Sequence, residues 1–563
     1  MKNLPELAHL GPYEDAIEAA LEELQDQNIV ARIWEKDHTV WHDDPAQITN
    51  RLGWLDIAAR VREDVPRFEE LRRTLLAEGY TDVLHMGMGG SSLAPDVFGR
   101  VFGGEVPGLR LHVLDSTDPG AVLGYARELE PAHTLYIVAT KSGTTVETLS
   151  FFKYFYNRAL EALGQKEAGA HFVAITDPGS KLAALGERLG FREIFLNDPN
   201  IGGRYSALSY FGMVPAALVG VDVARLLERA QAMMEACGPR VPPAQNPGAW
   251  LGAVMGTLAN EEVDKLTLVA SPKLAPFGDW VEQLIAESTG KSETGILPVV
   301  GEPLVQAGNY RPDRLFVHLG LPGDTPYEAQ LDALADAGFP VVHLPVDDLY
   351  DMGGLFFVWE LATAVAGERL EIQPFNQPNV ESAKKRAKEM VRAYHEQGAL
   401  PPAEYAELQP ESLTDFLAQA RPPADEQPCG PEDVGGDYIA LQAFVEPTPE
   451  TDAALQKLRT RLLLRYNVAT TLGYGPRYLH STGQLHKGDA GHGLFVQLVS
   501  HAPEDAPIPD EPGETGSSIT FDVLKQAQAQ GDYRALLDAG RRIIRFHVGT
   551  GVVDAVRTLT EPL

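Results

Sequence analysis

The chain of 563 residues contains only two cysteines, Cys237 and Cys429. Two thiols cannot form a disulfide framework or a four-thiolate zinc site, which favours a reducing compartment. The sequence has no run of about 18 apolar residues, and its N-terminus lacks the basic start and apolar core of a signal peptide. We therefore expect a cytoplasmic protein that does not span a membrane.

Basic residues are scarce, at 47 against 79 acidic ones, for a net charge of −32. An acidic surface repels nucleic-acid phosphates and anionic membranes, so we expect no nucleic-acid partner and no membrane partner. A small phosphorylated ligand remains possible, because a few local cations can bind it against an unfavourable overall field.

Composition and length predict a globular chain of several domains. Hydrophobic residues make up 44% and charged residues 22%, which is ordinary for globular proteins. At roughly 150 residues per domain, three or four domain-sized units are expected. Residues 1–75 carry apolar residues at helical spacing and predict an N-terminal helical cap.

After residue 76, short apolar runs alternate with helical stretches, as in doubly wound α/β domains with buried parallel strands. The first series of predicted strands is 82–88, 109–115, 133–140, 170–176 and 193–196. The second series is 265–270, 314–320 and 340–345. We predict a first α/β domain over 76–240 and the first part of a second over 241–398.

The remaining sequence is more irregular. Residues 399–436 are rich in Pro, Glu and Ala and predict an exposed or poorly structured excursion. Strand signals resume at 438–445 and 493–499, and residues 502–516 form an acidic, proline-rich loop. We predict that the strands and helices of 437–563 complete the second domain.

A glycine-rich turn, Gly87–Ser92, follows the first predicted strand and precedes a helical stretch. Glycines let the backbone approach an anion closely, and the helix N-terminus offers free N–H groups to a phosphate. A plain turn is equally compatible with this motif alone. A dinucleotide site is a third possibility, because Asp115 ends the next strand where a ribose contact would lie.

A second candidate, Thr140–Thr145, reads Thr-Lys-Ser-Gly-Thr-Thr and is followed by Glu147. Its hydroxyls and backbone donors at a helix start suit a phosphate group, although an N-capping run without a ligand shows the same residues. Ligands of such sheets bind outside the carboxyl ends of the strands, so both loops are expected to converge on one phosphate.

Two further segments contain residues with catalytic potential. Gly202-Gly203-Arg204-Tyr205-Ser206 allows close backbone approach beside a guanidinium, and Glu287-Ser288-Thr289-Gly290-Lys291 ends a predicted helix. A glutamate in the last turn is disfavoured by the helix dipole, which is sometimes the trace of a functional carboxylate. Read alone, each segment is also compatible with a surface residue at a helix end.

Taken in order, these four segments resemble the phosphoglucose isomerase family. The resemblance covers about residues 80–395 and continues in the Pro-Phe-Asn-Gln-Pro block that starts at Pro374, followed by Lys384. It implies an α/β fold of two doubly wound sugar-isomerase (SIS) sandwich domains, with an N-terminal helical cap and additional C-terminal elements. It also implies the interconversion of glucose 6-phosphate and fructose 6-phosphate through an enediolate.

The resemblance assigns roles residue by residue. Glu287 would be the base, Arg204 would stabilise the enediolate, and Lys384 would assist ring opening. The substrate-binding residues implied are Gly90, Ser91, Thr140, Lys141, Ser142, Thr145 and Gln377. Since Glu and Arg supply base and electrophile, we expect no metal and no cofactor.

The sequence departs from the family in two places. The usual Ser-Lys-Thr order becomes Thr-Lys-Ser at residues 140–142, which keeps the hydroxyls. The family's catalytic histidine precedes the lysine, whereas here the matching string Leu-His-Ser-Thr-Gly-Gln contains His480, after Lys384. This order is similar to that of the isomerase part of fused transaldolase–phosphoglucose isomerases. His480 is predicted to open the sugar ring, with His486 as the rival.

Three alternatives remain open from the sequence. A dual phosphoglucose/phosphomannose isomerase would use the same base and arginine. The glycine turn and Asp115 would suit an NAD-dependent dehydrogenase, and a sugar-phosphate-sensing SIS protein would need the phosphate loops without the acid and base groups. The family resemblance also implies a homodimer.

Overall fold

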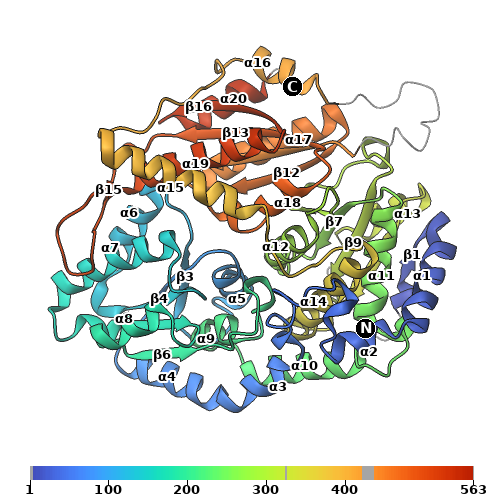
Figure 1. Ribbon diagram of the computed structural model, residues 1–563, viewed down its shortest axis with the longest axis horizontal. Helices are drawn as coiled ribbons and strands as arrows, with labels where there is room; N and C mark the ends of the chain where they lie inside the picture. The colour runs from blue at the N-terminus through green and yellow to red at the C-terminus, as the bar shows by residue number, and fades with distance from the viewer. Residues whose placement is uncertain (1–3, 324–325, 421–435, 562) are drawn as a thin grey trace.

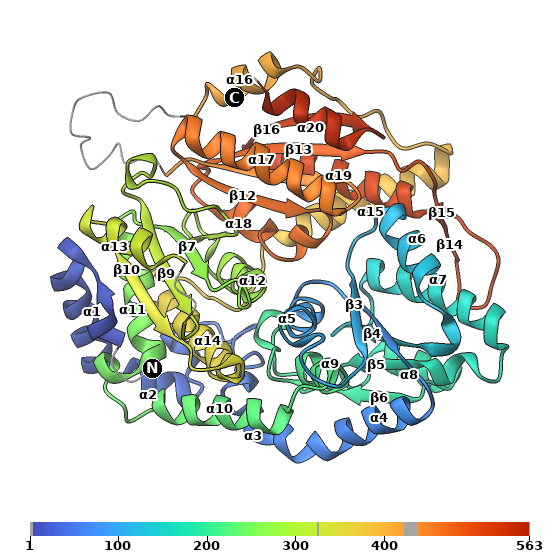
Figure 2. The same ribbon diagram turned by 180° about the vertical axis from the view of Figure 1, so that it is seen from behind.

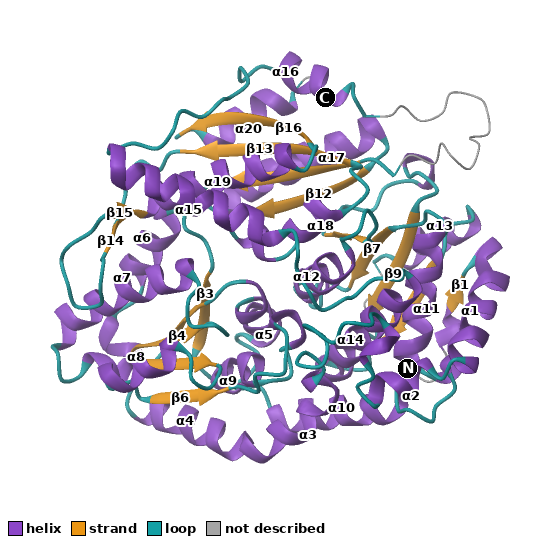
Figure 3. Ribbon diagram, in the orientation of Figure 1, coloured by secondary structure: helices purple, strands orange, loops and turns teal. Residues whose placement is uncertain are grey.

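The computed structural model describes residues 4–323, 326–420, 436–561 and 563, and three mainly parallel sheets dominate the part it describes (Figures 1 and 3). The predicted α/β class is confirmed. The sheets and their covering helices surround the middle of the molecule (Figure 2). There, α5 (Leu93–Phe102) and α12 (Phe277–Thr289) lie beside η13 (Arg477–His480), the turn that follows β12 (Ala469–Tyr474).

The first sheet has the order β3-β2-β4-β5-β6, with every neighbouring pair parallel. Its central strands are mostly apolar and buried along their whole length, as expected for strands covered on both faces. The strands are β2 (Asp82–Met86), β3 (Arg110–Leu114), β4 (Thr134–Ala139), β5 (Phe172–Thr176) and β6 (Glu193–Leu196). The helices of this unit are α5 (Leu93–Phe102), α6 (Pro119–Glu128), α7 (Val146–Leu163), α8 (Lys181–Leu189), α9 (Tyr210–Val219) and α10 (Val223–Ala236).

The second sheet has the order β1-β10-β9-β7-β8. Its strands are β7 (Lys265–Ala270), β8 (Leu297–Val300), β9 (Arg314–Gly320) and β10 (Val341–Pro345). The helices are α11 (Pro247–Asn260), α12 (Phe277–Thr289), α13 (Glu328–Asp336) and α14 (Met352–Arg369), followed by α15 (Val380–Gln397). By length and composition, residues Leu349–Arg369 could cross a membrane, but 83% of their most apolar window is buried against the rest of the chain, as in a core helix.

The prediction that residues 437–563 complete the second domain is wrong in one respect, because these strands form a separate sheet. Its order is β12-β11-β13-β16. The strands are β11 (Tyr438–Phe444), β12 (Ala469–Tyr474), β13 (Gly493–Ser500) and β16 (Arg542–Gly549). We had predicted only β11 and β13, and two strands alone could not have formed an independent sheet.

Helices cover both faces of the third sheet, so this sheet can form a unit with its own hydrophobic core. Alternate residues of a strand point to opposite faces. Ile439 and Leu441 pack with α17 and α20, whereas Tyr438 and Ala440 pack with Leu536 of α19 and with residues of α12. The helices of this unit are α16 (Pro410–Leu417), α17 (Pro449–Tyr466), α18 (Gly483–Gly488), α19 (Phe521–Asp538) and α20 (Val552–Thr560).

The flanking segments differ in detail from expectation. The N-terminal region is helical, with α1 (Glu14–Asp26), α2 (Ile29–Trp34), α3 (Ile57–Val61) and α4 (Val65–Ala77), but β1 (Ala8–His9) adds an antiparallel edge to β10. The predicted Pro-rich excursion contains α16, whose Leu413 and Leu417 are buried in the third unit's core. Residues 421–435 of that excursion lie outside the described residues. In the acidic loop, β14 (Pro507–Ile508) pairs with β15 (Ile519–Thr520), which follows the loop.

Candidate active site

A cleft of about 780 Å³ lies at the carboxyl ends of the strands of the first sheet. It is lined by all eleven residues predicted from the sequence: Gly90, Ser91, Thr140, Lys141, Ser142, Thr145, Arg204, Glu287, Gln377, Lys384 and His480. The structure therefore brings together residues that are far apart in the sequence. It does not by itself test their roles.

The two phosphate-loop candidates sit side by side, as the parallel arrangement of β2 and β4 requires. The loop Thr140–Thr145, called the hydroxyl loop below, is ordered by two hydrogen bonds within it. They join Thr140 Oγ1 to Thr145 Oγ1 at 2.8 Å and Ser142 Oγ to Thr144 Oγ1 at 2.8 Å. Thr145 is the N-cap position of α7, so the loop meets the positive end of that helix. This arrangement can receive a phosphate group.

The ammonium of Lys141 is already engaged within the protein. Its Nζ lies 2.5 Å from Asp177 Oδ2 and donates to the Pro199 carbonyl at 2.8 Å. Asp177 follows β5, so this ion pair holds the hydroxyl loop to the neighbouring strand end. Asp177 thus partly neutralises the charge of Lys141, one of the residues that the family resemblance assigns to substrate binding.

Two glycine-containing loops, Gly87–Ser92 and Gly202–Ser206, are in close backbone contact at the cleft. A Cβ placed on Gly90 would lie 2.0 Å from the carbonyl oxygen of Gly203, which no side chain could tolerate. Gly89 has a φ of +53°, and a Cβ there would lie 2.7 Å from the carbonyl oxygen of His480. Glycine is required at both positions, because only it permits this contact between three separate segments.

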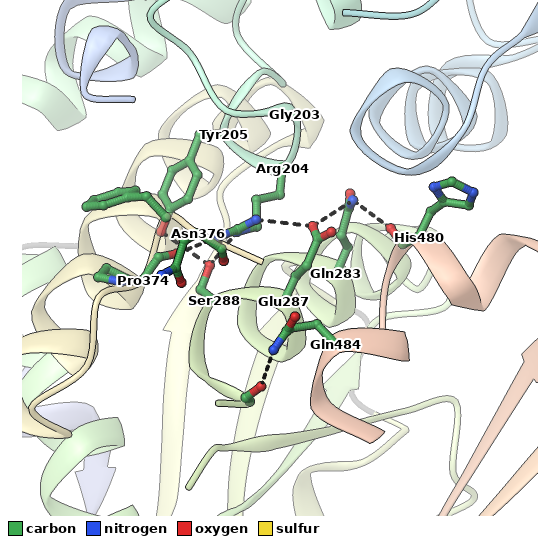
Figure 4. A network of polar contacts seen from close by, with 12 residues as sticks. Gly203, Arg204, Tyr205, Gln283, Glu287, Ser288, Pro374, Asn376, His480 and Gln484 are labelled. Atoms are coloured by element: carbon green, nitrogen blue, oxygen red, sulfur yellow. Dashed lines mark hydrogen bonds and ion pairs between the residues drawn. The ribbon is translucent and has the colours of Figure 1, made fainter. Parts of the chain in front are cut away.

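Arg204 is almost fully buried and is held by backbone and hydroxyl acceptors. Its Nε donates to Ser288 Oγ at 2.7 Å and its Nη2 to the Pro374 carbonyl at 2.6 Å (Figure 4). Its Nη1 lies 3.4 Å from Glu287 Oε2. Lys291 donates to the Asn376 carbonyl at 2.8 Å, so α12 and its C-terminal turn fix the Pro-Phe-Asn-Gln-Pro block against Arg204.

The carboxylate of Glu287 is buried in the cleft wall. It accepts a hydrogen bond from Gln283 Nε2 at 3.1 Å, and the same amide nitrogen donates to the His480 carbonyl at 2.8 Å (Figure 4). Burial raises the pKa of Glu287, and Arg204, His480 and Lys384 offset part of that rise. The group is thus a stronger base when ionised than an exposed glutamate.

His480 enters the cleft from the third unit. It ends the short helix η13 (Arg477–His480), and its Nε2 lies 3.0 Å from Glu147 Oε1. Burial alone would raise the pKa of Glu147, but the charge and hydrogen bond of His480 bring it below its ordinary value. The same carboxylate oxygen accepts from Gln528 Nε2 at 2.7 Å, which orients it toward the histidine.

The rival histidine lies elsewhere. His486 is buried among the rings of Tyr438, Tyr478 and Phe495, and it does not line the cleft. Burial lowers its pKa well below the ordinary value. The dinucleotide alternative required Asp115 to contact a ribose. The side chain of Asp115 is instead buried, and its Oδ2 lies 3.2 Å from Arg477 Nη1.

Several residues of the site carry no sequence signal that we recognised. Gln47 and Arg51 reach the cleft from the N-terminal region, and Asp177 and Gln283 complete its lining. Arg51 is isolated in the sequence, so no motif surrounds it. Burial and the nearby charge of Arg204 lower the pKa of Arg51. Within the described residues, no cluster of three or more His, Cys, Asp or Glu side chains could hold a metal ion.

A second cavity, of about 740 Å³, lies on the other side of α12. It is lined by Glu282 and Ser481, whereas their sequence neighbours Gln283 and His480 line the first cleft. Burial raises the pKa of Glu282 to about 8. Helix α12 and the turn before α18 are therefore a wall shared by the two cavities.

Known proteins resemble this chain over its greater part. A family model described as phosphoglucose isomerase matches residues 63–296. The glucose-6-phosphate isomerase of Rubrobacter xylanophilus is 30% identical over 381 residues, covering 58% of this chain and 86% of that protein. The enzyme of the same name from Thermus thermophilus is 30% identical over 379 residues, covering 59% of this chain and 88% of that protein.

Two solved structures share the fold. A hypothetical protein from Thermus thermophilus gives a TM-score of 0.58 at 26% identity and covers 68% of this chain and 99% of its own. A glucose-6-phosphate isomerase from Chlamydia trachomatis gives a TM-score of 0.51 at 21% identity, over 66% of this chain and 78% of its own.

Proposed function

The chain belongs to the phosphoglucose isomerase family, and from that premise we propose how its cleft interconverts glucose 6-phosphate and fructose 6-phosphate. One observation carries the proposal. A buried carboxylate, Glu287, lies 3.4 Å from the buried guanidinium of Arg204, in the same cleft as a carboxylate-paired histidine and the hydroxyl loop. A base, an electrophile and a proton shuttle thus surround one volume.

The phosphate anchors the substrate. Ser91 and the hydroxyls of Thr140, Ser142 and Thr145 donate hydrogen bonds to its oxygens, at the N-terminus of α7. Charge-assisted bonds of this kind contribute roughly 1.5–3 kcal/mol each. Because isomerisation happens at carbons 1 and 2, anchoring carbon 6 places the reacting atoms without taking part in the chemistry.

His480, assisted by Lys384, catalyses the opening of the sugar ring. A neutral histidine near pH 7 can accept one proton and donate another. The proton of the anomeric hydroxyl leaves to one group, the bond from carbon to the ring oxygen breaks, and the ring oxygen receives a proton. The Glu147 carboxylate, 3.0 Å from the His480 ring, orients the imidazole. Gln377 contacts a sugar hydroxyl.

Glu287 transfers the proton between carbon 2 and carbon 1 of the open-chain sugar. Its carboxylate removes the proton from carbon 2 of the open-chain aldose, and the electrons of that bond form the enediolate double bond. Arg204 neutralises the developing oxyanion as a permanent cation. The proton of the carbon-2 hydroxyl passes to oxygen 1 and the carbonyl re-forms at carbon 2. Glu287 returns its proton to carbon 1, which leaves the ketose and regenerates the carboxylate.

A coupled assay of the purified chain tests this proposal. With fructose 6-phosphate as substrate, formation of glucose 6-phosphate is followed as NADP reduction by an added glucose-6-phosphate dehydrogenase. We expect turnover that a metal chelator leaves unchanged. Absence of turnover at any pH between 6 and 9 would refute the function. A parallel assay with mannose 6-phosphate decides whether the specificity is dual.

We further propose that the enzyme acts as a cytoplasmic homodimer. The family resemblance and the scarcity of cysteine support this proposal. Sedimentation equilibrium gives the mass directly. A chain of 61.2 kDa should sediment at twice that mass, and a single species at the monomer mass would contradict the dimer.

A further inference from the structure

The third unit contributes His480, whereas Arg204 lies in the first unit and Glu287 in the second. The chain reaches it from β12 of the third unit, through the turn η13. Its ring meets Glu147 of α7, and its carbonyl meets Gln283 of α12. Its position in the cleft therefore depends on how firmly η13 is held between the first and second units.

Arg477, three residues before His480, makes that connection. Its Nη2 lies 2.9 Å from Asp96 Oδ2 of α5 and 3.4 Å from Asp279 Oδ2 of α12. Its Nη1 lies 3.2 Å from Asp115 Oδ2, just after β3. One guanidinium thus joins three carboxylates from three elements, two in the first unit and one in the second.

Of the three carboxylates, Asp115 depends most on this cation, because Arg100 also pairs with Asp96 and Asp279. Asp115 is almost fully buried, and burial raises its pKa while Arg477 lowers it. Like charges brought together repel one another, and a buried charge without a partner is costly. The guanidinium, with five fixed donors, can pair with several carboxylates at once, which a lysine cannot match.

Arg477 cannot act on the substrate directly. It lines the second cavity, on the far side of α12, and not the cleft that contains His480. Its neighbour Tyr478 is anchored to its own unit, since its hydroxyl donates to Asp532 Oδ2 of α19 at 2.6 Å. The turn is thus fixed to the third unit by Tyr478 and to the other two units by Arg477.

We propose that Arg477 is a positioning residue for catalysis, which holds His480 in the cleft by clamping η13 to α5, to the end of β3 and to α12. This rests on the proposed function, in which His480 opens the sugar ring. Displacing a catalytic group by about 1 Å can reduce a rate by about 100-fold. Loss of the clamp should therefore slow ring opening and spare proton transfer.

The test compares two substrates in Arg477→Gln. Fructose 6-phosphate must be opened, whereas 5-deoxyfructose 6-phosphate lacks the hydroxyl that closes the ring. We expect kcat to fall about 10- to 100-fold on the first and less than about threefold on the second, with KM unchanged because the phosphate loop is untouched. Equal losses on both substrates would overturn the proposal.

A double variant separates positioning from general destabilisation. If Arg477 acts only through His480, then Arg477→Gln combined with His480→Ala should be no slower on fructose 6-phosphate than His480→Ala alone. Losses that multiply would overturn the proposal. Arg477→Lys should recover part of the rate, since an ammonium keeps one of the contacts.

Arg100→Gln is the matched control. Arg100 also pairs with Asp279, at 2.7 Å, and with Asp96, at 3.4 Å, but it lies on α5 and its side chain is 52% exposed. Its hydrogen bonds and ion pairs go to Asp96 and Asp279 and not to η13, so kcat should stay within about twofold of wild type, and a loss as large as that of Arg477→Gln would overturn the proposal. Should Arg477→Gln fail to fold, Asp96→Asn removes its shortest partner and should show a smaller loss in the same direction.

An activity-independent readout distinguishes this proposal from the proposed function. In protein labelled with ¹³C-histidine, the His480 resonance is assigned by its absence in His480→Ala. Arg477→Gln should shift this resonance and Arg100→Gln should not. An unshifted resonance would overturn the clamp, whereas a shift in a chain that never isomerises fructose 6-phosphate would overturn the function and leave the clamp standing.

Discussion

Glu287 and Gln283 are one helical turn apart on α12, and this spacing directs both side chains into the cleft. The glutamine cannot ionise, so its contribution is geometric. Its amide nitrogen lies between the Glu287 carboxylate and the His480 carbonyl, at 3.1 and 2.8 Å. One side chain therefore fixes the separation between the proposed base and the proposed ring-opening group.

Replacing Glu287 by Gln keeps its shape and removes the basic carboxylate. General-base contributions are typically about 10²- to 10⁴-fold, so kcat should fall by that factor. Binding of a sugar-phosphate inhibitor should change little, because the hydroxyl loop is untouched. The variant should also stop exchanging the proton on carbon 2 with solvent deuterium. Exchange at a near wild-type rate would remove Glu287 as the base.

The pH dependence of kcat/KM follows from the raised pKa of Glu287. Only the ionised carboxylate can accept a proton, so activity falls as the pH drops through that pKa. Since burial raises the pKa, the acid limb should lie above the ordinary glutamate value of about 4.3. A profile of kcat/KM from pH 4 to 9 measures it. An acid limb at or below the ordinary value would contradict the assigned environment.

The two histidines of the LHSTGQLH string should behave differently. His480→Ala should depress turnover of fructose 6-phosphate by about tenfold or more and that of 5-deoxyfructose 6-phosphate far less, because its ring faces the cleft. His486→Ala should instead lower the melting temperature, since it leaves a hole among three aromatic rings. The opposite pattern would mean that the segment is aligned wrongly with the family motif.

At the scale of elements, the cleft depends on loops that touch without side chains between them. Gly90→Ala would place a Cβ 2.0 Å from the Gly203 carbonyl oxygen, so the two loops must separate. We expect a loss of at least about tenfold in kcat/KM and a lower melting temperature. Gly124→Ala is the control, because a Cβ there, on helix α6, meets nothing within 4 Å. Wild-type kinetics in Gly90→Ala would show that the contact is dispensable.

Strand prediction succeeded where burial is continuous and was less complete at sheet edges. The strands β2, β4 and β7 are mostly apolar and buried almost throughout, because helices cover both faces. Among the edge strands, β3 and β6 were predicted, whereas β8, β12 and β16 were not. The last contains Arg542 and Arg545, which pair with other parts of the protein and hide the apolar pattern.

The motifs after strand ends predicted residues that line the cleft, because parallel strands bring those loops to one edge. Lining residues without a motif around them were not predicted. Arg51 and Gln47 have no distinctive neighbours in the sequence, and Glu147 acts through His480, which is 333 residues away. Only a three-dimensional structure shows such partners.

At the scale of the whole molecule, the third unit is joined to the second by a buried polar network. Glu302, just after β8, accepts hydrogen bonds from the backbone N–H and the hydroxyl of Thr470 on β12, both at 2.8 Å. It also lies 2.9 Å from Arg314 Nη1 on β9. Arg459 of α17 adds a bond from its Nη1 to the Val300 carbonyl at 2.8 Å. This network ties the sheet that contains Arg314 to the sheet that leads to His480.

Removing Glu302 should therefore weaken the junction between the second and third units and lower the stability of both. Glu302→Ala leaves the guanidinium of Arg314 buried without its carboxylate, since both side chains are almost fully inaccessible. Breaking one partner of a buried pair costs about 3–5 kcal/mol, so the free energy of unfolding in urea should fall by that amount. Glu504→Ala is the control, because both side chains of its ion pair with Arg127 are 64% exposed and the pair contributes about 1 kcal/mol or less.

The same variant tests how far activity depends on the third unit. As urea is raised, Glu302→Ala should lose fructose 6-phosphate turnover at the concentration at which the third unit unfolds, because His480 belongs to that unit. If Glu302→Ala were no less stable than Glu504→Ala, the junction between the second and third sheets would not depend on this network.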